Sequence, residues 1–410
     1  MARILVVGGS LGGLMAAGLL LRAGHAVTVL ERSQRSLQGR GAGIVTHDCL
    51  RTALRGAGAV VDDTLGVPVA SRVVLAQDGS AECTWDHAQV LTSWGRLYAL
   101  LRAVVPADHH RLGAAVTAVQ SRPDGVSAVL ATGETLHADL LIACDGIRST
   151  VRGQLLPQVQ PVYAGYVAWR GVCDEAALSR HTRDTLFGHF GFGLPAGEQM
   201  IGYPVAGADD RTDVGHRRWN FVWYRPAAAG ADLAALLTDA DGAHHADGIA
   251  PQQVSWRQIA AMRQAARERL APQFAEIVEK TAVPFLQPIF DLVSPTLAFD
   301  RVALLGDAAM VARPHVGMGV AKAGEDAVVL AQCIAEHGTA PLALQRYAAL
   351  RQPASLAVVE RARHLGGYLQ AHAHAGAQGA PPTQPRSAQD VMRQTAIDPR
   401  FFAQQQETTA

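Results

Sequence analysis

Four short, mainly apolar runs recur along the chain, at residues 3–7, 26–30, 138–143 and 301–305. An apolar run with little polar alternation predicts a strand buried on both faces, as in a parallel sheet. The first two runs are joined by residues 14–23, which are small and apolar and predict a helix closed by Gly24. The hydrophobic pattern therefore predicts an α/β fold built on a parallel sheet.

Glycines and an acid mark the first of these units. Gly8 and Gly13 occupy the first and third glycine positions of a G-x-G-x-x-G turn, and Ser10 replaces the second. Such a turn lets backbone N–H groups and the positive helix end approach a pyrophosphate, and Glu31 is placed to accept hydrogen bonds from a ribose. The pattern predicts a bound dinucleotide, NAD or FAD. An ordinary βαβ unit without a ligand is the alternative.

Composition narrows the class of protein. The chain has 410 residues and a formal net charge of zero, which argues against a nucleic-acid partner held by charge. Five cysteines are scattered without a C-x-x-C pair and predict reduced thiols rather than disulfides or a metal site. No apolar stretch is long enough to span a membrane, and the N-terminus does not resemble a signal peptide. We therefore expect a cytoplasmic protein with no metal.

The middle of the chain has a different texture. Residues 71–75 and 81–85 flank Asp78-Gly79, which predicts a hairpin. Strand-like segments between residues 163 and 284 carry most of the aromatic side chains and predict a second domain based on a sheet.

The C-terminal part is expected to be helical at first. Residues 320–337 and 341–368 predict helices, the second interrupted near Pro353. Beyond residue 371 the chain is rich in Ala, Gln, Pro and Thr, which predicts a tail that packs loosely or is partly disordered.

Three motifs stand in a fixed order: the unit from Gly8 to Glu31, then Cys144-Asp145-Gly146, then Gly306-Asp307-Ala308-Ala309. Together they resemble the group A, FAD-dependent aromatic hydroxylases of the p-hydroxybenzoate hydroxylase type, over the chain to about residue 370. Residues 163–171 and Arg313-Pro314-His315 more narrowly resemble members that hydroxylate pyridines. The resemblance implies a Rossmann-like FAD-binding domain with an inserted β-sheet substrate domain and C-terminal helices.

The implied domains follow the chain in pieces. The FAD-binding domain takes 1–70, 93–160 and 291–335, the substrate domain a hairpin at 71–92 and a sheet at 161–290, with C-terminal helices at 336–370 and a tail at 371–410.

The resemblance also assigns the cofactor site. In this family Asp307 binds the FAD near its ribityl chain and pyrophosphate, and Asp145-Gly146 lies between FAD and NAD(P)H. The predicted cofactor-binding residues are Gly8, Ser10, Leu11, Gly13, Glu31, Arg32, Arg40, Gly43, Arg96, Asp145, Gly146, Asp307, Gly317 and Gly319. The sequence departs from the family at Met310, where a histidine is frequent, and at Lys322, where an asparagine is common.

The implied reaction hydroxylates an electron-rich hydroxylated ring, with O2 and NADH or NADPH, through a flavin C4a-hydroperoxide. A base that removes a ring proton is then needed, and histidine suits this role near neutral pH. His47 and His315 are the catalytic candidates, with Pro314 fixing the loop. Tyr203, Trp223 and the same two histidines are the predicted substrate contacts.

Several alternatives remain open at this point. A structural role is the alternative for each of these histidines and aromatic residues, and Tyr203 or Tyr224 is the alternative base. Arg170 or Arg313 could anchor an acidic group. A flavin-dependent oxidase and a non-catalytic FAD-binding module are the competing functions. The sequence leaves the substrate, the choice of NADH or NADPH, and a possible homodimer undecided.

Overall fold

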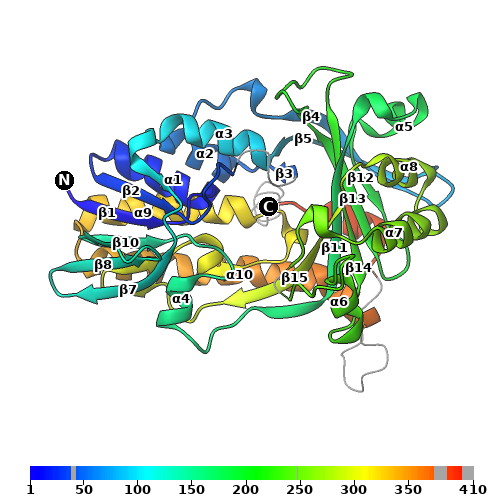
Figure 1. Ribbon diagram of the computed structural model, residues 1–410. Helices are drawn as coiled ribbons and strands as arrows, with labels where there is room; N and C mark the ends of the chain where they lie inside the picture. Colours follow the sequence, from blue (N-terminus) through cyan, green and yellow to red (C-terminus); the bar gives the residue numbers. More distant parts are fainter. Residues whose placement is uncertain (38–42, 247, 374–385, 399–410) are drawn as a thin grey trace.

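The computed structural model describes residues 1–37, 43–246, 248–373 and 386–398. Its first layer is a six-stranded sheet in the order β16-β17-β10-β1-β2-β6, shown on the left of Figure 1. Its strands are β1 (Arg3–Val7), β2 (Ala26–Glu31), β6 (His110–Leu112), β10 (Leu140–Ala143), β16 (Ala298–Phe299) and β17 (Val302–Leu304). All pairs are parallel except β16 with β17. The predicted parallel sheet is therefore confirmed.

Helices and a small sheet cover this layer. Figure 1 shows α1 to α3 above the sheet and the three-stranded sheet β7-β8-β9 below it. The elements are α1 (Leu11–Arg22), α2 (Asp48–Ala57), α3 (Trp94–Val104), α4 (Thr150–Leu155), α9 (Gly319–His337), β7 (Val116–Arg122), β8 (Gly125–Leu130) and β9 (Thr135–Ala138). Burial on both faces explains why the central strands lack polar alternation.

The second layer is a nine-stranded sheet in the order β18-β15-β11-β14-β13-β12-β4-β5-β3. Its strands are β3 (Gly43–Val45), β4 (Val67–Leu75), β5 (Ala81–Ser93), β11 (Val162–Asp174), β12 (His189–Gly193), β13 (Gln199–Val205), β14 (Arg218–Pro226), β15 (Phe285–Val293) and β18 (Met310–Val311). The predicted hairpin is β4-β5, although both strands are longer than the sequence suggested. Its edge strands β3 and β18 come from segments assigned above to the FAD-binding domain.

The two faces of this sheet pack against different partners. Along β14, Trp219, Phe221 and Trp223 lie in a core with the helices α5 (Arg180–Leu186), α6 (Ala231–Leu236), α7 (Trp256–Arg269) and α8 (Pro272–Lys280). Val222 and Tyr224 alternate with them and pack in another core. Only this second face looks toward the dinucleotide-binding layer.

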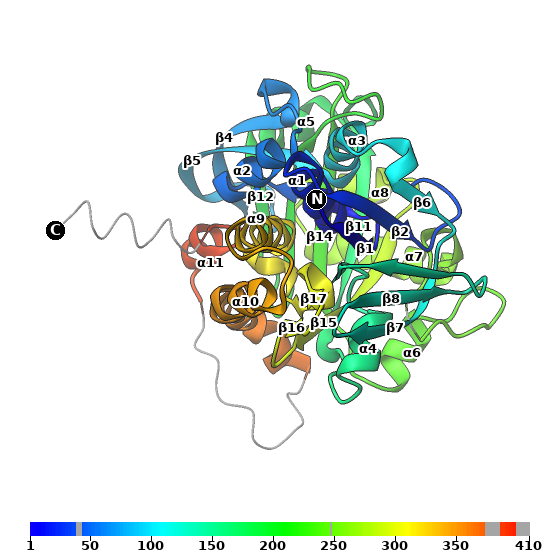
Figure 2. The ribbon, with the colours of Figure 1, turned by 90° about the vertical axis from the view of Figure 1, so that its left-hand side faces the viewer.

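The C-terminal part differs from expectation in two ways. Helix α10 (Pro341–Ala373) runs on through Pro353, where an interruption was expected. Proline costs a helix one hydrogen bond, but packing against α9 supports α10. The expected loose tail contains α11 (Ala388–Gln394), which lies beside α10 in Figure 2 and buries Val391 and Met392. For residues 386–398 the prediction of loose packing is wrong.

Candidate functional site

A cavity of about 430 Å³ lies between the two large sheets. Its floor is formed where β1, β10 and β17 end, at Ser10, Cys144 and Asp307, and its opposite wall comes from β13 and β14. A site outside the carboxyl ends of parallel strands is the usual place for a ligand in an open α/β sheet. All three sequence motifs thus meet at one cavity.

The glycine turn is shaped by close backbone approach. Gly8 has φ +107°, and a Cβ there would lie 2.3 Å from the carbonyl oxygen of Cys144. A Cβ on Gly13 would lie 1.9 Å from the oxygen of Gly8. Ser10, Leu11 and Gly12 line the cavity at the start of α1, and the Ser10 side chain makes no capping bond. The predicted pyrophosphate turn is therefore present, with a serine hydroxyl at the second glycine position.

Glu31 stands at the tip of β2, as predicted. Its carboxylate accepts hydrogen bonds from the backbone N–H groups of Gly9, at 2.9 Å, and Ser33, at 2.8 Å. These bonds hold the acid beside the glycine turn, where a ribose hydroxyl could also reach it. The neighbouring Arg32 is exposed and close enough to Arg148 to lower the pKa of that guanidinium, after burial as the main cause.

Asp307 presents a carboxylate to the cavity from the turn after β17. The Asp307 side chain is exposed to the cavity, and the protein that forms the walls of the cavity lies around its carboxylate. This surrounding protein raises the pKa of Asp307, opposed by the charge of Lys322. A carboxylate accepts hydrogen bonds, so Asp307 suits the hydroxyls of a ribityl chain.

The turn that carries Asp307 is fixed from below. Lys322 is fully buried and donates to the carbonyl of Gly306, at 3.0 Å, and to Asp326, at 3.2 Å. Asp326 also accepts the N–H of Gly306 at 3.1 Å and Arg351 Nε at 2.8 Å. The departure at Lys322 is therefore a support of the turn, and neither Lys322 nor Met310 lines the cavity.

The start of α9 also opens on the cavity. Pro314, Gly317 and Gly319 line it, and Gly317 has φ +66°. A Cβ on Gly319 would meet no atom within 4 Å, so this glycine faces open space. The first N–H groups of a helix favour an electron-rich ligand edge. These three residues therefore lie at the cavity, and their roles toward FAD stay predictions.

Asp145 and Gly146 follow β10. Gly146 lines the cavity with φ +81° and open space where a Cβ would stand. Asp145 accepts the N–H of Val151 at 3.2 Å, and burial raises its pKa. The carboxylate therefore organises the loop before α4, while the backbone of Gly146 touches the cavity.

Gly43 brings strand β3 against the opposite wall. Its N–H donates to Asn220 Oδ1 at 2.8 Å, and a Cβ there would lie 2.4 Å from Tyr203. Gly43 and Tyr203 both line the cavity. The candidate Arg40 lies outside the described residues.

The aromatic wall carries polar groups suited to a small ring. Tyr203 and Tyr224 line it together with Arg170 and Gln287, and Arg170 Nη1 donates to Gln287 Oε1 at 2.9 Å. Burial raises the pKa of both phenols, and the Arg170 charge opposes this, so both remain protonated donors at neutral pH. Sequence reasoning missed Gln287, since a lone glutamine in a strand carries no pattern.

Trp223 is a correction. The residue was expected to contact the substrate, but it is fully buried on the other face of β14, where Arg225 stacks over it at 4.6 Å. Side chains alternate across a strand, so a shift of one residue exchanges the faces. Tyr224 occupies the position that Trp223 was predicted to fill.

His315 lies behind the aromatic wall and does not line the cavity, contrary to expectation. Its ring is 4.1 Å from the Tyr224 ring, and its Nε2 and Nδ1 are 2.9 Å from Tyr166 Oη and Gln199 Oε1. An amide oxygen only accepts, so Nδ1 carries the proton and Nε2 accepts from Tyr166. Burial lowers the pKa of His315 to about 3. A neutral, enclosed imidazole positions Tyr224 rather than touching a substrate.

Arg313 is likewise occupied by protein. It forms a buried ion pair with Asp291 at 2.7 Å and lies over the ring of Tyr166. An acidic substrate group would have to compete with Asp291. Arg170 is therefore the arginine left as a candidate anchor.

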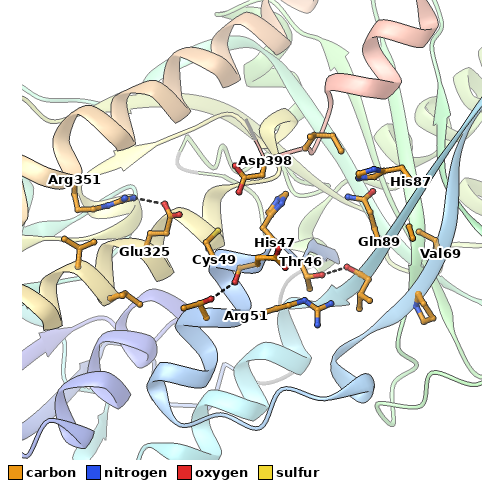
Figure 3. A pocket seen from close by; sticks show the side chains of 18 residues that line it. Thr46, His47, Cys49, Arg51, Val69, His87, Gln89, Glu325, Arg351 and Asp398 are labelled. Atoms are coloured by element: carbon orange, nitrogen blue, oxygen red, sulfur yellow. Dashed lines mark hydrogen bonds and ion pairs between the residues drawn. The ribbon is translucent and has the colours of Figure 1, made fainter. Parts of the chain in front are cut away.

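His47 borders a second and larger cavity of about 890 Å³, shown in Figure 3. Its Nε2 donates to the carbonyl of Gly317 at 3.1 Å. Residues 46–49 line this cavity, whereas residues 43–45 line the first one. His47 thus contacts the flavin-side loop from behind, and a catalytic role for it stays a prediction.

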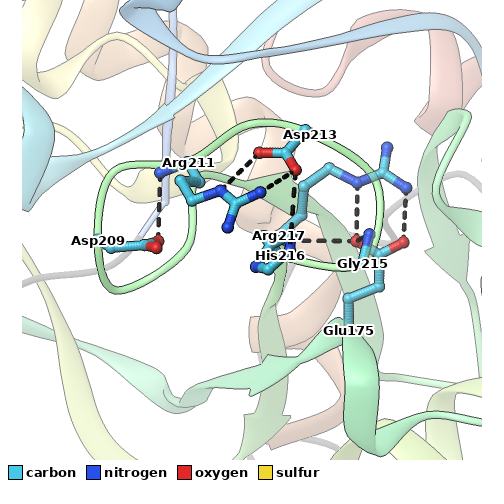
Figure 4. Close-up of polar contacts among 7 residues, drawn as sticks. All are labelled: Glu175, Asp209, Arg211, Asp213, Gly215, His216 and Arg217. Atoms are coloured by element: carbon cyan, nitrogen blue, oxygen red, sulfur yellow. Dashed lines mark hydrogen bonds and ion pairs between the residues drawn. The ribbon is translucent and has the colours of Figure 1, made fainter.

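Arg96 also lies off the cavity wall. It donates to Thr64 Oγ1 at 2.8 Å and pairs with Asp210 at 3.5 Å. Asp210 belongs to the loop between β13 and β14, drawn in Figure 4. Arg96 therefore joins this loop to α3, and its contact with FAD stays a prediction.

Figure 4 shows what holds the loop. Arg217 makes two bonds to the buried carboxylate of Glu175, at 2.7 and 2.9 Å, and the N–H of Gly215 donates to the same group. Burial alone would raise the pKa of Glu175, but these bonds outweigh it and the pKa is lowered. A second pair, Arg211 with Asp213 at 2.6 Å, is exposed and contributes little.

The residues at the first cavity fit FAD. Two helix N-termini, two glycines that face open space and the Asp307 carboxylate converge on it. The fold and the cavity together define a protein that binds a dinucleotide across a parallel sheet, next to an aromatic pocket.

Known proteins make the class specific. A family model described as FAD binding domain-like matches residues 163–291. The 2,6-dihydroxypyridine 3-monooxygenase of Paenarthrobacter nicotinovorans is 30% identical over 378 residues, 90% of this chain and 91% of that protein. The aurachin C monooxygenase/isomerase of Stigmatella aurantiaca is 32% identical over 362 residues, 85% and 84% of the two chains.

A solved structure agrees. The 2,6-dihydroxypyridine-3-hydroxylase from Arthrobacter nicotinovorans superposes with a TM-score of 0.85 at 28% identity, over 94% of this chain and 99% of that chain. The chain belongs to the family of FAD-dependent aromatic monooxygenases. FAD is its cofactor, and the predicted fold and enzyme class are confirmed. The relatives favour a monooxygenase rather than the competing oxidase or non-catalytic FAD-binding module.

Within the described residues, no helix combines the length and apolar character needed to cross a bilayer. Nor do three or more His, Cys, Asp or Glu side chains gather there in a way that could hold a metal ion.

Proposed function

We propose that this monooxygenase hydroxylates a small, electron-rich hydroxylated N-heteroaromatic ring of the hydroxypyridine type, with NADH or NADPH as electron donor. The observation that carries this proposal is the set of Arg170, Tyr203 and Tyr224 on the wall of the flavin cavity. Two relatives support the ring class by name, the 2,6-dihydroxypyridine and 6-hydroxynicotinate 3-monooxygenases.

The wall favours an oxygen anion on the ring. Arg170 brings a permanent positive charge, and the two phenols are protonated donors because burial raises their pKa. Hydrogen bonds in which one partner is charged are about twice as strong as neutral ones. A hydroxypyridine that releases its ring hydroxyl proton to bulk water as it binds becomes more electron-rich at its ring carbons. The anion is stabilised by these residues, so no histidine base is required on the wall.

Bound FAD supplies an electrophilic oxygen after reduction and reaction with O2. The protein has to orient the ring and keep water out. Val222, Ile201 and Ala312 give the cavity its apolar part, and the start of α9 opens on the cavity, where its N–H groups would favour an electron-rich edge of the flavin. This division leaves ring orientation to the polar wall.

The test compares substrates and two Arg170 variants. Hydroxypyridines and hydroxybenzoates are screened for stimulated NADH and NADPH oxidation and for product. For the best substrate, we expect Arg170→Met to raise KM at least about tenfold, the loss of one charge-assisted hydrogen bond. FAD content should not change, and Arg170→Lys should recover part of the loss.

Two outcomes would count against the proposal. Stimulation by hydroxybenzoates alone would remove the N-heteroaromatic class, and an unchanged KM in Arg170→Met would remove the anion site from the wall.

We also infer a reducing compartment, the cytoplasm, since five scattered cysteines without a C-x-x-C pair are typical of reduced thiols. A homodimer is a further proposal that light scattering of the holoenzyme tests.

A further inference from the structure

The C-terminal segment, residues 387–398, packs against the substrate sheet in an ordered way. Ser387 caps α11 by accepting the N–H of Asp390 at 3.1 Å, and Arg386 and Arg361 both donate to Gln394 Oε1. Val391, Met392, Ala396 and Ile397 are buried. The segment is therefore part of the folded protein, although the chain leading to it carries no apolar pattern.

One arginine holds the carbonyl end of this segment. Arg72, on β4, is fully buried and donates through Nη1 to the carbonyls of Met392, at 2.7 Å, and Thr395, at 2.6 Å. Its Nη2 donates to the carbonyl of Ala396 at 3.2 Å. The last carbonyls of a helix lack intrahelical partners, so one guanidinium satisfies the end of α11.

Arg72 is itself held rigidly. Its guanidinium lies 4.9 Å from the Phe190 ring and 5.7 Å from the Trp85 ring, its neighbours across the sheet. Gln89 Oε1 accepts a hydrogen bond from Arg72 Nε, at 3.0 Å, and another from Arg72 Nη2, at 2.6 Å. Burial lowers the pKa of Arg72 to about 9, so the group stays charged at neutral pH.

A buried charge of this kind needs a reason. Within the described residues, no carboxylate lies in ion-pairing distance of Arg72, and its acceptors are neutral oxygens. Burying a charge without a counter-ion is costly unless hydrogen bonds satisfy it. Three of the five hydrogen bonds that offset this cost go to one short segment, which points to a function for the position of that segment.

The segment passes between the two cavities. Ala396 lines the flavin cavity of about 430 Å³, and Ile397 and Asp398 line the cavity of about 890 Å³ in Figure 3. A second segment, β3 with the residues that follow it, also passes between the cavities: residues 43–45 line the flavin cavity and residues 46–49 line the larger one. These two segments therefore form the partition.

The segment also contacts the loop in front of α9. The N–H of Ala396 donates to the carbonyl of His315 at 2.8 Å. A Cβ on Gly317 would lie 2.9 Å from Ala396, and Gln199 Nε2 donates to Thr395 Oγ1 at 3.3 Å. Ala396 adopts φ +54°, a strained value for alanine that the surrounding bonds enforce.

We propose that residues 387–398 form a wall that closes the flavin cavity against the larger cavity, and that Arg72 is the positioning residue that holds this wall. Its function is to exclude water and so keep oxygen transfer coupled to NAD(P)H oxidation. The coupling part rests on the proposed function; the wall itself does not.

The primary test measures the wall directly in the full-length holoenzyme. Amide hydrogen exchange is followed in peptides from residues 387–398, and iodide quenching of the bound flavin reports solvent access. Arg72→Met should speed exchange there about tenfold or more, the effect of losing at least one charge-assisted bond, and should raise iodide quenching. Arg72→Lys should restore part of both.

Arg393→Met is the matched control. Arg393 lies on α11 and, like Arg72, stacks over the Trp85 ring, at 5.8 Å, but its side chain is exposed. Both readouts should match the wild type in this variant.

Met392→Ser keeps the test decisive if Arg72→Met does not fold. Met392 is fully buried in the core that α11 shares with the sheet, and its replacement weakens the docking of α11 while the Arg72 side chain is retained. It should raise exchange and quenching in the same direction. Unchanged exchange and quenching in the folded variants would overturn the wall.

Coupling is then measured as product and peroxide per NAD(P)H. Arg72→Met should shift the balance toward peroxide at least about threefold, since added water access promotes unproductive decay. If wild type hydroxylates no ring, the proposed function fails while exchange still reports on the wall. If wild type is coupled and Arg72→Met remains so despite faster exchange, the coupling role is refuted.

Discussion

Replacing His315 by glutamine tests whether this histidine is a neutral structural group or a base. The side chain is fully buried between Tyr166 and Gln199, and burial lowers its pKa to about 3. In the unfolded chain the same group has an ordinary pKa of 6.5. Because the folded pKa lies below the unfolded one, His315 favours folding fully above pH 6.5, and this contribution is lost as pH falls.

The size of the effect follows from the two pKa values. Each pKa unit corresponds to about 1.4 kcal/mol, so a fall from pH 6.5 to pH 5 removes about 2 kcal/mol of stability. The full difference between 6.5 and about 3 would remove roughly 5 kcal/mol near pH 3. His315→Gln cannot take up this proton, so its stability should fall less between pH 7.5 and pH 5, by about 2 kcal/mol.

The assay is urea denaturation of the apoprotein at both pH values, followed by tryptophan fluorescence. The compared quantity is the change in the free energy of unfolding between the two pH values, in which the constant cost of the substitution cancels. His137→Gln, at an exposed position, controls for the loss of a histidine as such. Equal changes in wild type and His315→Gln would refute a neutral buried His315 and return it to the list of bases.

Two more predictions follow from charged groups. Asp307→Ala should weaken FAD binding about ten- to a hundredfold, because the Asp307 carboxylate faces the cavity. Asp145→Ala should retain FAD but slow its reduction by NAD(P)H. Titration of the apoprotein with FAD measures the first effect, and stopped-flow reduction measures the second. Arg217→Leu should destabilise the protein at pH 7 by about 3 kcal/mol, since it strands the buried carboxylate of Glu175. The pKa of Glu175 is lowered in the folded state, so the stability difference between wild type and Arg217→Leu should shrink as pH falls below 4.5. Thermal unfolding of both proteins at pH 7 and below pH 4.5 measures this difference, and an equal difference at both pH values would contradict the reasoning.

The backbone of the cofactor site could be predicted because its constraints are local. Gly13 is required by its contact with Gly8 in the same turn, Gly8 itself adopts φ +107°, and a buried strand that ends in Gly-Asp places Asp307 at the sheet's edge. Lys322 shows the limit of such reasoning. It was marked as a departure near the flavin because the family commonly has an asparagine at this position, but its partners Gly306 and Asp326 turn it away from the cavity.

The direction of side chains on the second sheet could not be predicted. Both faces of β14 are buried, one under helices and one against the cavity, so Trp223 and Tyr224 lie in equally apolar sequence surroundings. Polar alternation assigns faces only when one face meets water. The choice between these neighbours needs the position of α7 and α8, which the sequence of β14 does not contain.

The C-terminal segment combines both cases and shows where a sequence could have revealed more. Ser387 followed by Asp390 is a helix N-cap signal, and Val391-Met392 is an apolar pair on the predicted helix. Those signals were present within a region whose composition suggested disorder. The partner that gives the segment its place, Arg72, is 320 positions away from Met392 and sits in a strand where a charged residue would normally face water. A buried arginine among Trp85, Phe190 and Phe192 is explained by its acceptors, the carbonyls of the C-terminal segment and the amide oxygen of Gln89. The composition of the segment predicted disorder because it takes account of the segment alone, whereas the ordered structure depends on Arg72, a donor in a distant part of the chain.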